Sequence, residues 1–129
     1  MANFDILDNK ETLSTVEMIR SCLATAWFKP NTSIGIVVPQ FVFAKHLANS
    51  LWEEDATVPS WIKSGMAHKT FGQTTFDNGS RIKLIHSTMG IKGVSVNLLY
   101  VHRDVNIDDE WMYAFMPALS SGHLIKFFQ

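Results

Sequence analysis

The chain of 129 residues lacks most features of secreted or membrane proteins. It contains one cysteine, Cys22, which excludes an internal disulfide and is expected to be a small core residue. No stretch approaches the ~18–20 consecutive apolar residues of a membrane span, and no basic region followed by an apolar run opens the sequence. We therefore expect a soluble, intracellular protein that makes no membrane contact.

Charge is also scarce, and it is unevenly distributed. Charged residues make up 18% of the chain, and the net charge is −1. The segment 63–103 nevertheless carries six basic residues against Asp77 alone, a balance of +5. The six are Lys63, Lys69, Arg81, Lys83, Lys92 and Arg103. Such a segment can form a basic face for nucleic acid or for an acidic protein. Ordinary surface residues on a solvated hairpin are the alternative.

The spacing of apolar residues predicts helices in some segments and strands in others. Val16, Ile19 and Leu23 recur at helical spacing, whereas the β-branched run at 33–39 ends in a proline. The turn Asp77-Asn78-Gly79 lies between β-prone residues and predicts a hairpin. The predicted order is helix 11–28, strand 33–39, helix 40–54, hairpin 74–86, strand 97–102, a helix from 108, and strand 123–128.

This order predicts one α/β domain over residues 1–129, with three layers and a mainly parallel sheet flanked by helices. We expect the strands near 34–38, 97–102 and 123–128 to be adjacent in the centre of the sheet. The 74–86 hairpin is expected at an edge.

Side chains in catalytic patterns are few. The five histidines show no paired spacing and have no cysteine partners, which argues against a structural zinc site. No small-residue elbow surrounds a serine nucleophile. Paired carboxylates occur only at 53–55 and 108–110, where they suit solvated helix ends. We predict no metal and no cofactor.

A phosphate-binding loop is also missing its usual residues. Such a loop needs glycines that let backbone N–H groups reach phosphates, a lysine for charge, and a hydroxyl for magnesium. The segment 8–19, "DNKETLSTVEMI", has no glycine, and only Thr15 could hold a metal. Lys10 precedes the turn and cannot replace the missing lysine in the same geometry.

Four short sequence motifs nevertheless occur in a recognisable order: "DNGSRIKL" at 77–84, "IKG" at 91–93, "NLLYV" at 97–101 and "PALSSG" at 117–122. Together they resemble the ATPase domain of the large terminase subunit of tailed bacteriophages, the motor that packages DNA. That family has a similar hairpin, an Arg-Gly loop, an apolar strand ending in Asp-Glu, a helix and a Ser-Ser-Gly turn. The resemblance covers roughly residues 9–127 and implies a P-loop NTPase-like fold, degenerate and truncated.

The departures from the family pattern concern its chemistry. The phosphate-loop glycine, lysine and threonine fall on Leu13, Ser14 and Thr15. The metal-site aspartate falls on His102 and the catalytic glutamate on Arg103. Phosphoryl transfer depends on charge around the γ-phosphate and its metal, and three of those charges are absent or reversed. The resemblance thus implies a vestigial nucleotide site, near the carboxyl ends of the strands, without ATP hydrolysis.

Three functions remain open at this stage. The first is a phage-encoded pseudo-ATPase in the host cytoplasm that binds a protein, either the packaging motor or a host protein. The second is a nucleic-acid-binding module that uses Arg81, Lys83, Lys92 and Arg103. The third is residual nucleotide binding through Thr15 and Arg103.

Aromatic residues would support the first function, because protein interfaces favour them. The residues concerned are Trp52, Trp61, Trp111, Tyr113 and Phe115. Trp61 and Trp111 are the aromatic candidates for a partner-binding surface. The same rings could instead belong to the core.

Overall fold

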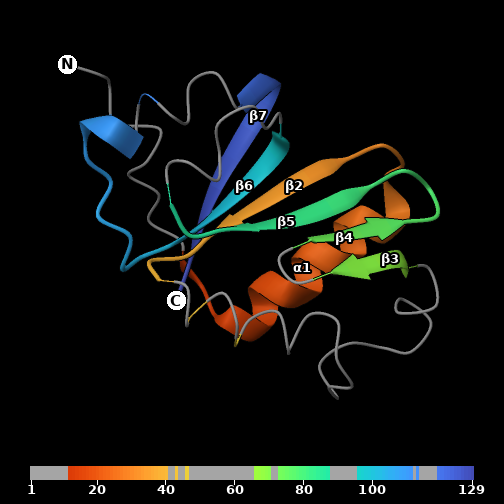
Figure 1. Ribbon diagram of the computed structural model, residues 1–129, viewed down its shortest axis with the longest axis horizontal. Coiled ribbons are helices and arrows are strands. Elements are labelled where there is room, and N and C mark those ends of the chain that lie inside the picture. The colour runs from red at the N-terminus through yellow and green to blue at the C-terminus, as the bar shows by residue number, and fades with distance from the viewer. Residues whose placement is uncertain are drawn as a thin grey trace.

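The computed structural model describes residues 12–40, 43, 46, 66–70, 73–87, 96–111, 113 and 119–129, with only the backbone described at 66–70 and 119–124. Seven strands form one sheet in the order β1-β7-β6-β2-β5-β4-β3 (Figure 1). The elements are β1 (Thr12–Leu13), α1 (Thr15–Phe28), β2 (Ser33–Val37), β3 (Met66–Thr70), β4 (Gln73–Phe76), β5 (Arg81–Ile85), β6 (Val96–His102) and β7 (Leu119–Phe128).

The sheet is mainly parallel, as predicted. Strands β1, β7, β6, β2 and β5 are parallel neighbours, whereas β5–β4 and β4–β3 pair antiparallel. The strands predicted near 34–38, 97–102 and 123–128 correspond to β2, β6 and β7, and the prediction that they are adjacent is confirmed. The last strand begins at Leu119, earlier than the predicted 123.

The predicted edge position of the hairpin is only partly right. Strands β4 and β5 do form a hairpin, but β5 pairs with β2 inside the sheet. Its Ile82 and Leu84 are buried, and this apolar face explains why β5 is an inner strand. The edge is β3, at 66–70, which the sequence patterns did not indicate.

The turn of this hairpin is fastened to the end of α1. Asn78 Nδ2 donates to the backbone oxygens of Ala26 and Trp27, at 2.7 and 3.0 Å. Gly79 has a φ of 88°, and a Cβ there would collide with Asn31 Oδ1. The "DNGS" motif therefore has a structural role, because Asn78 bonds carbonyl groups that the end of a helix leaves without partners.

Helix α1 ends before Pro30 as predicted, but it begins at Thr15, because Ser14 caps it. Its buried stripe includes Met18 and Cys22, and Val16, expected on that stripe, is 44% exposed. Of the predicted helix 40–54, three residues are described: Gln40 lies in a bend, whereas Phe43 and His46 have helical backbone.

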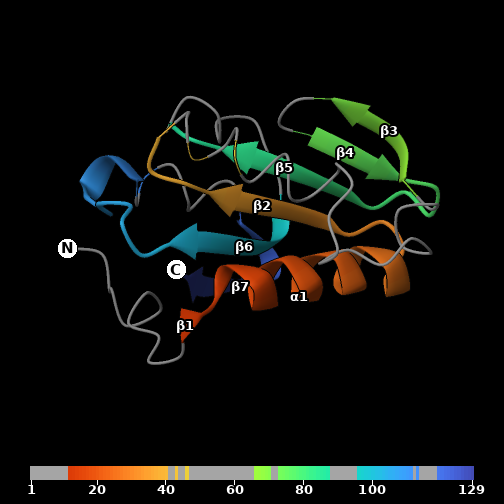
Figure 2. The same ribbon diagram turned by 90° about the horizontal axis from the view of Figure 1, so that it is seen from below.

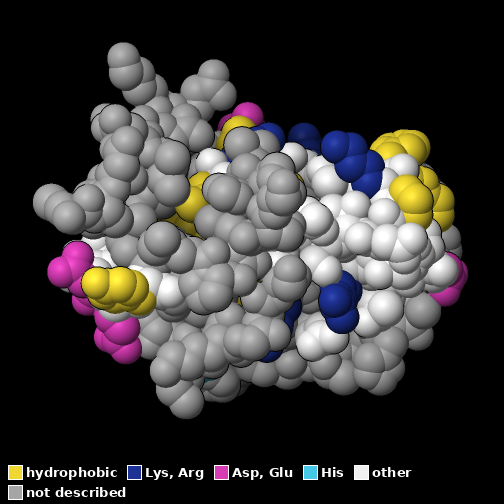
Figure 3. All heavy atoms as spheres, turned by 90° about the horizontal axis from the view of Figure 1, so that it is seen from above, with side chains coloured by type: hydrophobic (Ala, Val, Ile, Leu, Met, Phe, Trp, Pro, Cys, Tyr) yellow, Lys and Arg dark blue, Asp and Glu magenta, His cyan; other side chains and the backbone are white. Residues whose placement is uncertain are grey.

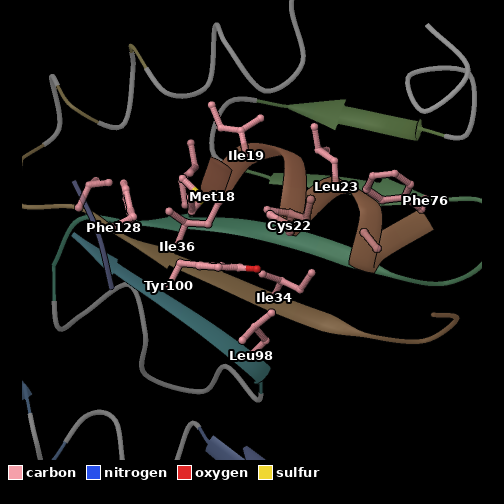
Figure 4. Packing of buried hydrophobic residues seen from close by; sticks show 14 residues of the cluster. Met18, Ile19, Cys22, Leu23, Ile34, Ile36, Phe76, Leu98, Tyr100 and Phe128 are labelled. Carbon is pink, nitrogen blue, oxygen red and sulfur yellow. The ribbon is translucent and has the colours of Figure 1, made fainter. Parts of the chain in front are cut away.

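Apolar side chains cover both faces of the sheet. The α1-side cluster contains Met18, Ile19, Cys22, Leu23, Ala26, Ile34, Ile36, Val38, Phe76, Ile82, Leu84, Leu98, Tyr100 and Phe128 (Figure 4). The opposite cluster contains Val37, Ile85, Val96, Leu99, Val101, Val105, Ile125 and Phe127. Helix α1 covers the first face (Figures 1 and 2), and Ile107 and Trp111 pack on the second.

The segment after β6 turns into a short helix near the predicted position. Residues 109–111 and 113 have helical backbone, and Asp108 Oδ1 accepts a hydrogen bond from Trp111 N at 3.1 Å. Within the described ranges, no helix is long and apolar enough to cross a membrane.

Candidate functional site

Four chain segments meet where the parallel strands end. Gln129 N donates to Leu13 O at 2.9 Å, and Thr15 N donates to Gln129 O at 3.2 Å. Arg103 N donates to Phe128 O at 3.0 Å. The end of β7 therefore joins the end of β6 to β1 and the start of α1, which lie together in Figure 2. The sequence prediction that residues 102–103 lie at this edge is confirmed.

The start of α1 is closed by its own side chains. Glu17 N donates to Ser14 Oγ at 3.1 Å, and Ser14 N donates to Glu17 Oε1 at 3.2 Å, forming a capping box. A phosphate at a helix N-terminus needs these N–H groups and the positive end of the helix dipole. Here a carboxylate holds that position, and Thr15 N is bonded to Gln129 O.

Glu17 is the residue of this edge that the sequence patterns were not used to predict. Its signal was present, because Ser14-Thr-Val-Glu17 has the S/T-x-x-E spacing of a capping box. The predicted phosphate-loop position Ser14 is thus an N-cap. Its neighbour Leu13 pairs with Phe128 as part of β1. Neither residue supplies the glycine or the lysine of a phosphate-binding loop.

His102 is a packed core residue. Its side chain is 4% exposed, and its ring centroid lies 4.5 Å from that of Phe43 and 5.1 Å from that of Phe128. Nδ1 accepts a hydrogen bond from Asp104 N at 3.0 Å, which places the proton of the neutral ring on Nε2. Burial lowers the pKa of His102, and the Asp104 carboxylate, 3.9 Å from Nδ1, opposes this only in part.

A metal site is not assembled around this histidine. Among the residues that the structure describes, no group of three or more histidine, cysteine, aspartate or glutamate side chains could hold a metal ion. The imidazole of His102 instead contacts two phenylalanine rings. Hard cations such as magnesium prefer oxygen ligands.

Arg103 is held in place by two neighbouring strands. Its Cζ lies 4.1 Å from the centroid of the Phe127 ring, within the range of a cation–π contact. Its Nε donates to Thr12 Oγ1 at 3.0 Å. Arg103 is therefore a cation that fastens the end of β6 to β1. A guanidinium cannot accept a proton from an attacking water.

The basic residues predicted to act together are separated. Ser33 is level with Arg81 on β5 and with Asn97 on β6, at the amino ends of the parallel strands. Six residues of β6 then lead to Arg103, a distance of about 20 Å at the usual rise of a strand. Arg81 and Arg103 therefore lie at opposite ends of the sheet.

The remaining sequence candidates divide into two groups. Trp111 is half-buried against the opposite cluster, as a core residue, whereas Tyr113 is 76% exposed. Four candidates lie outside the described residues: Trp52, Trp61, Lys92 and Phe115.

Two further buried groups are structural. Tyr100 Oη and Ser21 Oγ share a hydrogen bond of 2.8 Å that links β6 to α1. Burial raises the pKa of Tyr100 to about 12. Burial also raises the pKa of the Cys22 thiol, so this residue is an inert core side chain, as predicted.

The burial of His102 predicts a pH dependence of stability. Because its pKa is lower in the folded state than its ordinary value of about 6.5, the unfolded chain binds more protons below that pH. The free energy of unfolding should therefore fall as the pH falls from 7 through the folded-state pKa, and level off below it. Urea unfolding at pH 7, 6 and 5 measures this.

The matched control is His102→Asn, which removes the titrating ring and keeps an acceptor for Asp104 N. The variant should lose less stability than the parent between pH 7 and pH 5, because the buried ring that would have to take up a proton is gone. Equal losses would contradict the assignment of this dependence to His102.

The edge thus combines a capped helix, a buried neutral imidazole and a fastened guanidinium. None of the three is a magnesium ligand or a free phosphate-binding group. No known protein-family model matches the chain, and a search of curated proteins finds no match.

Proposed function

We propose that this protein is a catalytically inactive domain of terminase-ATPase type, with a P-loop NTPase-like fold, that acts by binding another protein. The single observation that supports this most is the capping box, in which Glu17 holds the helix N-terminus that a nucleotide phosphate would need. On this proposal the domain is phage-encoded, and its partner is the packaging motor or a host protein.

Charge explains why nucleotide binding is disfavoured at this edge. A phosphate would have to displace the Glu17 carboxylate from the start of α1 and remain beside its negative charge. His102 is neutral and buried at neutral pH, so it offers a phosphate no positive charge. Arg103 is positive, but it is engaged with Thr12 and Phe127.

Exposed aromatic residues support a protein-binding role. Tyr113 is 76% and Phe28 69% exposed. Aromatic side chains are enriched at interfaces, where a partner covers them. These two are therefore the described positions at which a partner surface should be sought first.

The proposal predicts that the purified protein has no magnesium-dependent ATP turnover. Its melting temperature should not move with millimolar ATP and magnesium. A ligand present at a hundred times its dissociation constant would add ~2.7 kcal/mol of stability. In a domain of this size, 1 kcal/mol shifts the midpoint by roughly 2–8 °C, which is easily measured.

Calorimetry with ATP and with ADP serves as an independent check of the same result. A clear upward shift in melting temperature, or measurable heat of ATP binding, would reject the inactive-domain proposal in favour of residual nucleotide binding. A protein partner captured from infected cells, and lost on Tyr113→Ala or Phe28→Ala, would support the binding role.

A further inference from the structure

The sheet face opposite α1 changes from apolar to polar along its strands. Towards the carboxyl ends it is apolar and buried, as part of the opposite cluster. Towards the amino ends of β2 and β5 it is polar. Figure 3 looks onto this side of the molecule, and in its coloured part dark blue Lys and Arg side chains stand among white atoms, which are backbone and other side chains. Parallel sheets usually cover both faces with apolar residues, so a polar region needs an explanation.

Two cations occupy this polar region. Ile82 and Leu84 of β5 belong to the α1-side cluster, so the alternating Arg81 and Lys83 point to the other face. Arg81 is exposed and Lys83 is half-buried. On one strand face they are separated by about 7 Å of backbone.

Three of the four neighbours of these cations across the sheet are neutral residues whose side chains can form hydrogen bonds, and the fourth is Gly35, level with Lys83 on β2. Arg81 is level with Thr75 on β4 and with Ser33 on β2, and its Nε donates to Ser33 Oγ at 3.0 Å. Lys83 is level with Gln73 on β4. In the described part of the chain, neither cation forms an ion pair with a carboxylate.

We propose that this surface, defined by Ser33, Gln73, Thr75, Arg81 and Lys83, binds the phosphate backbone of duplex nucleic acid. No described carboxylate pairs with its two cations, and arginine, lysine, serine, threonine and glutamine are residues that contact phosphates. A protein interface would favour aromatic residues, and the described residues of this surface include none. The surface lies away from the carboxyl edge, so this inference does not depend on the proposed function.

The double variant Arg81→Gln/Lys83→Gln tests the proposal. Binding of a fluorescent duplex DNA to the full chain is measured by anisotropy between about 20 and 200 mM salt. Each neutralised phosphate contributes about 0.9 to the slope of log affinity against log salt. The variant should bind more weakly at low salt, and its slope should be smaller by about 2.

The matched control is Arg20→Gln/Lys29→Gln, which removes two exposed positive charges from α1 and its end. It should keep the parent slope. Equal loss in both variants would overturn the assignment to this surface, as would a parent protein that does not bind duplex at low salt. If polyglutamate competes as well as duplex at equal charge, the partner is an acidic protein and the proposal fails.

Discussion

Replacing Phe128 by alanine is expected to lower the free energy of unfolding by about 3–5 kcal/mol. The ring is fully buried in the α1-side cluster, where it lies at the end of β7 (Figure 4). It also forms one wall around His102, with the two ring centroids 5.1 Å apart. The substitution removes apolar area from the core and leaves a cavity beside the imidazole. Chemical denaturation at pH 7 measures the loss.

Phe127→Ala is the matched control for this variant. Phe127 is 3% exposed, but it faces the opposite cluster and lies under Arg103. Both variants should lose comparable stability, because each removes one buried aromatic ring. Only Phe128→Ala opens the surroundings of His102, so its pKa should rise towards the ordinary value. The pH dependence between 7 and 5 should then shrink in Phe128→Ala alone, and an equal dependence in both variants would contradict this.

Local signals account for the parts of the fold that the sequence predicted. The run at 33–37 and the Asp77-Asn78-Gly79 turn depend on neighbouring residues, and both form as expected. The place of the hairpin within the sheet depends on pairing between β5 and β2, which are distant in sequence. Such non-local pairing leaves no periodic trace in either segment, so the inner position of β5 was not predicted. The edge strand β3 pairs with its chain neighbour β4, so it was missed at the local level.

In the candidate site, too, some features follow from local sequence and chain order, and others depend on contacts between distant segments. Parallel strands placed residues 102–103 at the carboxyl edge, and chain order alone was enough to predict this. The contact between Arg103 and the Phe127 ring arises because β6 and β7 are parallel neighbours with His102 level with Phe128. Register of this kind cannot be read from one strand. The cap on α1 is a local feature, so it was readable and was overlooked.

Introducing the residues of the terminase ATPase pattern is expected to give the protein ATP binding that the parent lacks. The resemblance to the terminase ATPase pattern suggests four changes: Leu13→Gly, Ser14→Lys, His102→Asp and Arg103→Glu. The structure adds a fifth, Glu17→Ala, because its carboxylate would remain at the helix start beside the phosphates. Loss of the cap should cost about 0.5–2 kcal/mol, so circular dichroism must first establish that the variant is folded.

In the folded five-residue variant, magnesium and ATP at a hundred times the dissociation constant should stabilise by ~2.7 kcal/mol. At roughly 2–8 °C per kcal/mol, this gives a midpoint shift of at least about 5 °C. The control is the four-residue variant that keeps Glu17, which should bind ATP more weakly because the carboxylate opposes the phosphate charge at the positive end of α1. Equal ATP affinity in the two variants would show that Glu17 does not close the site. If the folded five-residue variant does not bind ATP, the vestigial nucleotide site itself is rejected. The terminase-like proposal would then depend only on the sequence motifs of the hairpin and the strands.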